Sequence, residues 1–292
     1  MKGLIIKGIG GFYYVRTDSG VIQTRGRGIF KKDGITLMVG DRVDIDILPD
    51  GDGVINRIEQ RDNCFDRPPI ANVDLLMVVF SGAKPRPNFD VIDKFLIMSE
   101  HHNVEAVLCM NKCDLVKESY INEIKKRYEG TYRFLSVSAE EMIGIQDIRD
   151  VLKGHKTAFA GPSGVGKSTI LNILIPEAQM ETGAVSDKTS RGRHTTRHVE
   201  IFDLDEESMI FDTPGFTSFN ITGVEAEELA SYYPEINTYL GKCRFDDCVH
   251  MKEPECAVRK AVGDGEIPEE RYESYKKNYY ELIELAKKRK RR

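Results

Sequence analysis

The sequence lacks any long run of apolar residues, and none approaches the ~20 residues that are needed to span a bilayer. The N-terminal stretch MKGLIIKGIGGFYYV is interrupted by glycines and has neither the apolar core nor the small-residue cleavage site of a signal peptide. The chain has 292 residues, of which 40% are hydrophobic and 30% charged, enough for two or three globular domains. We therefore expect a cytoplasmic, monomeric protein that does not bind membranes.

Cysteine is also scarce, with six residues in the whole chain. A secreted disulfide framework has a higher cysteine density in a shorter chain, so we expect reduced thiols. Cys64, Cys109 and Cys113 are scattered and are expected to pack as ordinary side chains, whereas the other three lie close together near the C-terminus.

An excess of positive charge is absent, because 42 Lys and Arg face 47 Asp and Glu and leave a net charge of −5. This balance excludes a protein that binds nucleic acid over its whole surface. Basic residues gather instead in residues 25–32, 190–198 and 287–292. Each run is either a solvated surface or a contact point for an anionic partner.

Residues 1–62 are predicted to form a small β-barrel. Short β-rich segments such as FYYVRT, VIQTRG and DRVDIDIL alternate with turn sequences such as DSG and PDGDG. About five strands in this length favour an OB-fold, although an SH3-like barrel has the same pattern. Four basic side chains of this part are expected to contact RNA phosphates: Arg25, Arg27, Lys31 and Lys32.

Residues 63–222 are predicted to form an α/β domain with a parallel sheet. VDLLMVVF at 73–80 is a continuous apolar run, typical of a strand buried on both faces. Helices are expected from Asn88, near 118–129 and near 145–153, with strands between them.

GPSGVGKS at 161–168 fits the phosphate-loop pattern and lies between an expected strand and an expected helix. Its glycines allow backbone N–H groups to surround phosphates, Lys167 would reach the β- and γ-phosphates, and Ser168 would bind Mg²⁺. The residues expected to bind nucleotide here are Gly161, Pro162, Ser163, Gly164, Val165, Gly166, Lys167, Ser168 and Thr169.

Three further segments complete a guanine-nucleotide site. In NKCD, Asp114 would accept hydrogen bonds from guanine, while Asn111 and Lys112 would brace the pocket. In SVSAE, the backbone of Ser138 and Ala139 would meet the guanine carbonyl. In DTPG, Asp212 would bind the Mg²⁺ ion and the Gly215 amide would face the γ-phosphate.

The base-reading segment precedes the phosphate loop, the reverse of the order in ordinary guanine-nucleotide switches. All these segments follow strands of one parallel sheet, where ligands of such sheets bind. Because domain termini often lie close together, joining them and cutting the chain elsewhere preserves the site. The order therefore predicts a circularly permuted P-loop GTPase domain.

Residues 223–292 are predicted to be mainly helical, with a zinc site and a basic tail. CRFDDCVHMKEPEC offers Cys243, Cys248, His250 and Cys256 as four ligands of one closed, structural zinc site.

The whole chain resembles the ribosome small-subunit-dependent GTPase A (RsgA) family, through the motif order, RGRHTTRH, DTPGF and the terminal cysteines. The resemblance implies an OB-fold, a permuted GTPase domain and a helical zinc domain. It also implies GTP or GDP, Mg²⁺ and Zn²⁺ as cofactors, and binding to the 30S subunit and 16S rRNA late in 30S maturation. Two alternatives stay open: a passive nucleotide-sensing RNA-binding protein and a zinc-delivering GTPase. A P-loop kinase is disfavoured by NKCD.

A glutamine is missing where Ras-like switches orient the attacking water, because Phe216 follows Gly215. RGRHTTRH is expected to replace it. Thr196, with Thr195 as the alternative, would bind Mg²⁺, and His194 would act on water. The competing interpretation of His194 is a solvated side chain.

Overall fold

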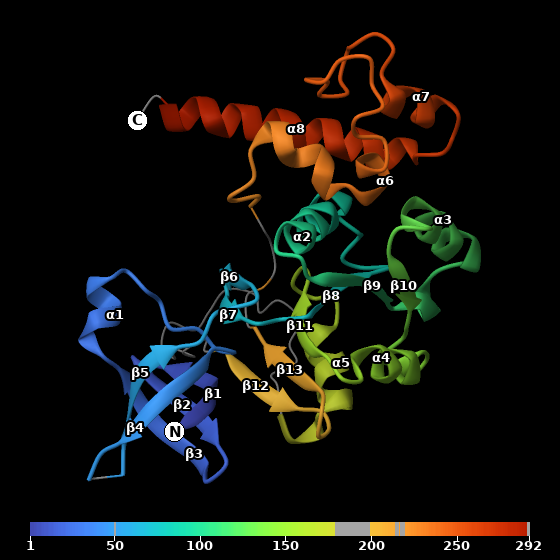
Figure 1. Ribbon diagram of the computed structural model, residues 1–292. Helices are drawn as coiled ribbons and strands as arrows, with labels where there is room; N and C mark the ends of the chain where they lie inside the picture. The colour runs from blue at the N-terminus through green and yellow to red at the C-terminus, as the bar shows by residue number, and fades with distance from the viewer. Residues whose placement is uncertain (50, 179–198, 214–215, 217–219, 291–292) are drawn as a thin grey trace, which may run out of the picture.

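The computed structural model describes residues 1–49, 51–178, 199–213, 216 and 220–290. Three parts follow one another along the chain: a β-barrel, a sheet with helices on both faces, and a helical C-terminal part (Figure 1). None of the helices in these residues combines the length and apolar composition that crossing a membrane requires.

The N-terminal part is a closed five-stranded barrel. Its elements are β1 (Lys2–Ile9), β2 (Phe12–Thr17), β3 (Gly20–Gly26), α1 (Gly28–Lys32), β4 (Arg42–Ile47) and β5 (Gly53–Ile58). The strand order is β1-β2-β3-β5-β4, β4 pairs back to β1, and β3 runs parallel to β5. Ile5, Val15 and Ile55 fill the interior and are fully buried. This Greek-key order is that of the OB-fold, so the preferred prediction is confirmed.

A short hairpin, β6 (Cys64–Asp66) and β7 (Pro69–Ala71), leads into the central sheet. The strands of that sheet are β8 (Leu75–Ser81), β9 (Glu105–Asn111), β10 (Arg133–Ser136), β11 (Lys156–Ala160), β12 (Glu200–Asp203) and β13 (Met209–Asp212). They lie in the order β10-β9-β8-β11-β13-β12, and only β12 is antiparallel to its neighbour in the domain. The predicted α/β class is confirmed.

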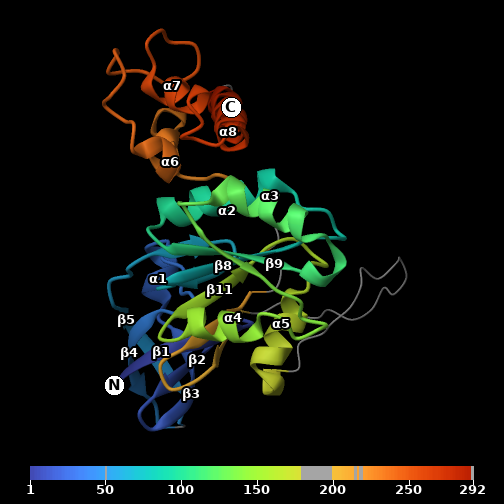
Figure 2. The same ribbon diagram turned by 90° about the vertical axis from the view of Figure 1, so that its right-hand side faces the viewer.

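Helices cover both faces of this sheet (Figure 2). One face carries α2 (Phe89–His101) and α3 (Glu118–Tyr128), and the other carries α4 (Ile145–Leu152) and α5 (Lys167–Leu174). Alternate residues of β8 serve the two cores: Val78 and Phe80 pack on the α2 side, and Met77 and Val79 on the α4 side. The apolar run at 73–80 is therefore buried on both faces, as its composition predicts.

The barrel and the central sheet are joined edge to edge. Strand β1 pairs with β12 at Lys7 and Glu200, which makes one eleven-stranded sheet. Two ion pairs support the junction: Lys7 Nζ lies 2.7 Å from Glu200 Oε2, and Arg16 Nη1 lies 2.5 Å from Asp203 Oδ2. No sequence pattern predicts this pairing.

The C-terminal part is mainly helical, as predicted, and covers α2 on the side away from the sheet (Figures 1 and 2). Its elements are η3 (Ala226–Tyr232), α6 (Pro234–Asn237), α7 (Ala257–Gly263) and the long α8 (Glu269–Lys290). Ile97 and Met98 of α2 belong to its hydrophobic core, together with Leu229 and Tyr233.

A buried ion-pair network joins the C-terminal part to the central domain. Arg271 of α8 is 1% exposed, and it donates from Nη1 to Asp93 Oδ1 of α2 at 2.5 Å. Its Nε donates to Glu235 Oε1 at 2.6 Å. Asp93 also accepts from Arg127 Nη2 at 3.0 Å and from the Tyr128 hydroxyl at 2.9 Å. Two carboxylates and two guanidinium groups thus balance one another at this interface, which we call the Asp93–Arg271 network.

We expect Arg271→Met to destabilise the protein by about 3–5 kcal/mol, because it removes the buried guanidinium partner of Glu235 and one of the two guanidinium partners of Asp93. The matched control is Lys277→Met, which breaks the ion pair between Lys277 and Asp90 across the same two helices. Both of those side chains are about half exposed, so the control should cost at most about 1 kcal/mol. Urea unfolding measures both, and equal losses would contradict the role assigned to Arg271.

Candidate functional site

The loop of residues 161–166 connects β11 to α5 at the carboxyl edge of the sheet. Gly161, Gly164 and Gly166 all have positive φ, of 141°, 78° and 96°. A Cβ at Gly161 would lie 1.9 Å from the Val79 carbonyl oxygen, and one at Gly166 would lie 2.2 Å from Asn111 Nδ2. Only glycine fits these two positions, so the backbone can take the shape that surrounds an anion.

Lys167 begins α5 and folds back over this loop. Its Nζ donates to the carbonyl oxygens of Gly161 at 2.5 Å and Pro162 at 2.7 Å. Burial lowers the pKa of Lys167 to about 8, because the charged form loses contact with water. A phosphate group beside the ammonium would favour its charged form and raise that pKa again. Ser168 and Thr169 follow in the first turn of the helix.

The predicted base-reading segment is bonded to the phosphate loop. Asn111, the last residue of β9, donates from Nδ2 to the Val165 carbonyl at 2.9 Å and accepts from the Ala139 amide at 3.0 Å. Lys112 has a φ of 63° and donates from Nζ to the Gly164 carbonyl at 3.0 Å. The three segments 111–114, 138–139 and 161–168 therefore form one connected unit.

The predicted base-reading residues differ in their exposure. Asp114 lies in the short 3-10 helix η1 (Cys113–Leu115) with its side chain exposed. Ser138 is buried, and its Oγ accepts from the Glu141 amide at 3.1 Å, which closes the turn that contains Ala139. An exposed carboxylate can accept hydrogen bonds from the N–H groups of a base, and fixed backbone amides can donate to its carbonyl group.

The remaining predicted groups are only partly described. Asp212 ends β13, the strand beside β11, and so lies at the same edge as the phosphate loop. Gly215, His194, Thr195 and Thr196 lie outside the described residues.

Phe216 has a position that the sequence did not predict. Its side chain is fully buried, with its ring 5.5 Å from that of Phe95 and 6.1 Å from that of Phe65. Its carbonyl accepts from the Gly161 amide at 2.9 Å. Phe216 therefore belongs to the core next to α2, and it links the segment after Asp212 to the first glycine of the phosphate loop.

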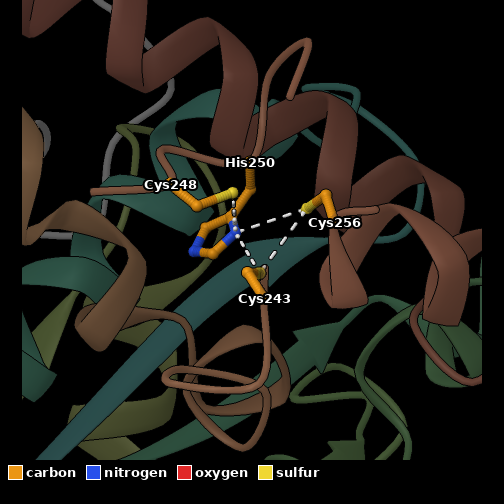
Figure 3. Close-up of side chains that lie close together, drawn as sticks. All are labelled: Cys243, Cys248, His250 and Cys256. Atoms are coloured by element: carbon orange, nitrogen blue, oxygen red, sulfur yellow. Dashed lines mark hydrogen bonds between the residues drawn. The ribbon is translucent and has the colours of Figure 1, made fainter. Parts of the chain in front are cut away.

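The four predicted zinc ligands lie together in the C-terminal part (Figure 3), with all their ligand atoms within 4.8 Å of one another. His250 Nδ1 lies 3.5, 3.4 and 3.5 Å from the sulfur atoms of Cys243, Cys248 and Cys256. The sulfur atoms of Cys243 and Cys256 are 3.9 Å apart. A zinc tetrahedron with Zn–S bonds of ~2.3 Å has N···S edges of about 3.5 Å and S···S edges of about 3.8 Å. The geometry fits Zn²⁺ with four protein ligands and leaves no open position.

Residues other than the four ligands hold the loop of this cluster. The hydroxyl groups of Tyr272 and Tyr275 on α8 donate to the carbonyl oxygens of His250 at 2.6 Å and Val249 at 2.8 Å. The Glu253 carboxylate accepts from the amides of Val249, Met251 and Lys252. The tyrosine-rich helix α8 thus orients the histidine ligand, a role that ligand spacing alone cannot reveal.

Comparison with known proteins gives the same architecture. The family model "RsgA GTPase" matches residues 58–222, and the model "RsgA N-terminal domain" matches residues 2–55. The small ribosomal subunit biogenesis GTPase RsgA of Alkaliphilus metalliredigens is 44% identical over 277 residues, covering 94% of this chain and 95% of that protein. The protein of the same name from Clostridium beijerinckii is 45% identical over 289 residues, covering 98% and 99%.

Two solved structures are similar over almost the whole chain. YjeQ from Thermotoga maritima has a TM-score of 0.82 and 35% identity, covering 97% of this chain and 98% of that one. YloQ, described as a circularly permuted GTPase, has a TM-score of 0.80 and 36% identity, covering 97% and 95%. The permuted order predicted from the motifs is therefore confirmed.

The lowered pKa of Lys167 predicts that nucleotide binding takes up protons. Because its pKa is lowered to about 8, the lysine of the free protein should lose its proton as the pH rises through that value. We expect a phosphate group beside the ammonium to restore the proton. GDP binding at pH 8 should take up roughly half a proton, and uptake should shrink toward pH 7, where both states are protonated. Calorimetry in two buffers of different ionisation enthalpy measures the uptake.

The control for this measurement is Lys167→Arg, because arginine stays protonated in both states. If the variant binds GDP, uptake at pH 8 should disappear. An absence of uptake in the parent protein would contradict the lowered pKa.

We expect one zinc ion per chain, and its removal should unfold the C-terminal part, because the metal-binding free energy contributes to folding. Cys248→Ser should lower the zinc content and reduce hydrogen-exchange protection in residues 223–290, leaving β8 and β9 protected. Cys64→Ser, which removes a thiol far from the cluster in sequence, is the control and should change neither. Protein purified without chelators that contains no zinc would contradict this assignment.

Proposed function

The chain belongs to the RsgA GTPase family, and on that premise we propose that it hydrolyses GTP to GDP and phosphate while bound to the small ribosomal subunit. The hydrolysis accompanies late maturation of the 30S particle and is stimulated by it. The observation that carries the proposal is the bonding of Asn111 and Lys112 to the phosphate loop, which makes guanine recognition and phosphate binding one site. The names of the curated relatives support the ribosomal partner.

We assign the phosphates to residues 161–169 and the base to Asp114, Ser138 and Ala139. Backbone N–H groups of the glycine loop donate to the phosphates, and Lys167 exchanges its two carbonyl partners for phosphate oxygens. Asp114 accepts from the two guanine N–H groups, and an adenine base offers no such pair of donors.

Ser168, Asp212 and Thr196 are the residues we assign to Mg²⁺. A magnesium ion bound there supplies neutralisation of the charge that develops on the β- and γ-phosphates. Ser168 follows Lys167 in the first turn of α5, and Asp212 is the last residue of β13, the strand next to β11. This placement suits a shared ion. The amide of Gly215 is assigned to the γ-phosphate.

The water-positioning group is assigned to His194. The buried Phe216 supports this choice, because its side chain packs in the core against Phe65 and Phe95 and has no polar group that could position water. Histidine can accept a proton from water near neutral pH. We propose that the small subunit brings His194 into place, which makes turnover by the free protein slow.

The partner is proposed to be the 30S subunit with its 16S rRNA, contacted by a monomer in the cytoplasm. Arg25, Arg27, Lys31 and Lys32 support contact with phosphate groups, because all four are exposed on the barrel. The four-ligand zinc site favours a structural ion over zinc delivery, which requires an exchangeable metal.

We further propose the domain boundaries 1–62, 63–222 and 223–292. The ranges of the two family models support the first division to within a few residues.

GTP turnover should be slow in the free protein and should rise by at least tenfold with 30S particles, and less with 50S or 70S particles. His194→Ala should abolish most of the stimulated rate without changing GDP affinity, because general-base groups contribute roughly 10²–10⁴-fold. His198→Ala in the same basic segment is the matched control and should retain stimulation. Fast turnover without subunits, or full stimulation of His194→Ala, would contradict the mechanism.

A further inference from the structure

Strand β2 carries aromatic side chains on both of its faces. Side chains alternate along a strand, and Val15 is fully buried, so Tyr13 shares its inward face while Phe12 and Tyr14 point outward. Tyr13 packs against the hydrophobic core, whereas Phe12 and Tyr14 do not. Outward positions of a sheet with one packed face are normally polar. Packing of the barrel therefore does not explain these two rings.

The neighbouring strand β3 adds a cation and an amide to the same face. The Arg25 guanidinium lies over the Phe12 ring, 4.3 Å from its centroid. The Tyr14 hydroxyl donates to Gln23 Oε1 at 3.2 Å. We call the outward face formed by Phe12, Tyr14, Gln23 and Arg25 the β2–β3 platform.

The charge on this platform is not neutralised. Within the described part of the chain, no carboxylate pairs with Arg25, and the nearest basic residue along the chain, Arg27, has only a loose contact with Asp46 at 3.7 Å. The charge of Arg16, the next outward residue of β2, is by contrast neutralised, because its Nη1 lies 2.5 Å from Asp203 Oδ2. A flat ring, an exposed guanidinium plane and uncompensated positive charge thus lie side by side.

These groups match the chemistry of an unpaired nucleobase. Bases stack on aromatic rings and on arginine planes, and the adjoining phosphates favour positive charge. Strands 2 and 3 form the ligand-binding face of OB-folds. A duplex offers no comparable ligand, because its bases are already stacked on one another.

We propose that the β2–β3 platform binds an unpaired base of RNA by stacking on Phe12, Tyr14 and the Arg25 guanidinium. The proposal rests on the proposed function, because it takes the small ribosomal subunit as the source of the RNA. It adds that the barrel recognises single-stranded rather than duplex RNA. The exposed lysines of α1, Lys31 and Lys32, attract phosphates of single-stranded and duplex RNA alike.

The test compares two labelled RNAs, a short oligouridylate and an RNA duplex of the same length, by fluorescence anisotropy with the full-length protein. The Phe12→Leu/Tyr14→Leu variant should bind oligouridylate about tenfold or more weakly, since stacking contributes strongly for each base. Its affinity for the duplex and the salt dependence of both affinities should stay unchanged. The Phe12→Tyr/Tyr14→Phe variant keeps both rings and should bind like the parent.

A charge variant separates stacking from electrostatic attraction. Lys31→Gln/Lys32→Gln should weaken both RNAs and reduce the slope of log affinity against log salt, because fewer counterions are released. Circular dichroism and the intrinsic GTP turnover of each variant establish that the fold is kept.

Three outcomes would overturn the proposal. The Phe12→Leu/Tyr14→Leu variant could bind oligouridylate as tightly as the parent, or it could lose equal affinity for oligouridylate and duplex. In the third outcome, Phe12→Tyr/Tyr14→Phe loses as much affinity for oligouridylate as the leucine variant does. Weaker co-sedimentation with 30S particles and unchanged binding of both RNAs would point to a protein occupant instead and would also overturn it. Failure of the proposed function is a separate result, namely that the parent protein does not co-sediment with 30S particles at all.

Discussion

The burial of Arg271 between Asp93 and Glu235 is the constraint on which the arrangement of the domains depends. A guanidinium group with 1% exposure is stable only where carboxylates lie close to it, and here two of them accept from its Nη1 and Nε at 2.5 and 2.6 Å. One carboxylate belongs to α2 and the other to α6. Sliding or rotation of the C-terminal part over α2 would separate these charges, so the network fixes one orientation of the zinc-binding part on the GTPase domain.

Helix α2 is consequently shared by two cores. Phe95 contacts Phe216 beside the nucleotide loop, while Asp93, two residues earlier, contacts Arg271 of the C-terminal part. The Phe216 carbonyl is in turn bonded to the Gly161 amide. If the segment after Asp212 rearranges, α2 therefore cannot shift with it without disturbing the zinc-binding part. These contacts connect the phosphate loop to the C-terminal part through Phe216 and α2.

Much of the fold and of the site chemistry was predictable because it is written in short contiguous segments. In the glycine loop, NKCD and the cysteine cluster, the functional residues lie within a few positions of one another. The continuous apolar run of β8 predicts burial on both faces of the sheet. Contacts between distant residues were not predictable. Asn111 meets Val165 across 54 positions, Asp93 meets Arg271 across 178, and Arg16 meets Asp203 across 187. Periodicity and propensity describe only local order, so these partners emerge only from topology. Likewise, FYYVRT indicates a strand but does not show that two of its rings face outward.

The pairing of β1 with β12 has a consequence for the exposed edges of the sheet. A strand at the margin of a sheet presents unpaired backbone groups that can add a strand from another molecule. Here the barrel pairs with the β12 edge of the GTPase domain at Lys7 and Glu200, and the barrel itself closes through β1 and β4. The N-terminal barrel thus acts as a cap against edge-to-edge aggregation as well as a candidate RNA-binding module. A GTPase domain separated from it would expose that margin to self-association.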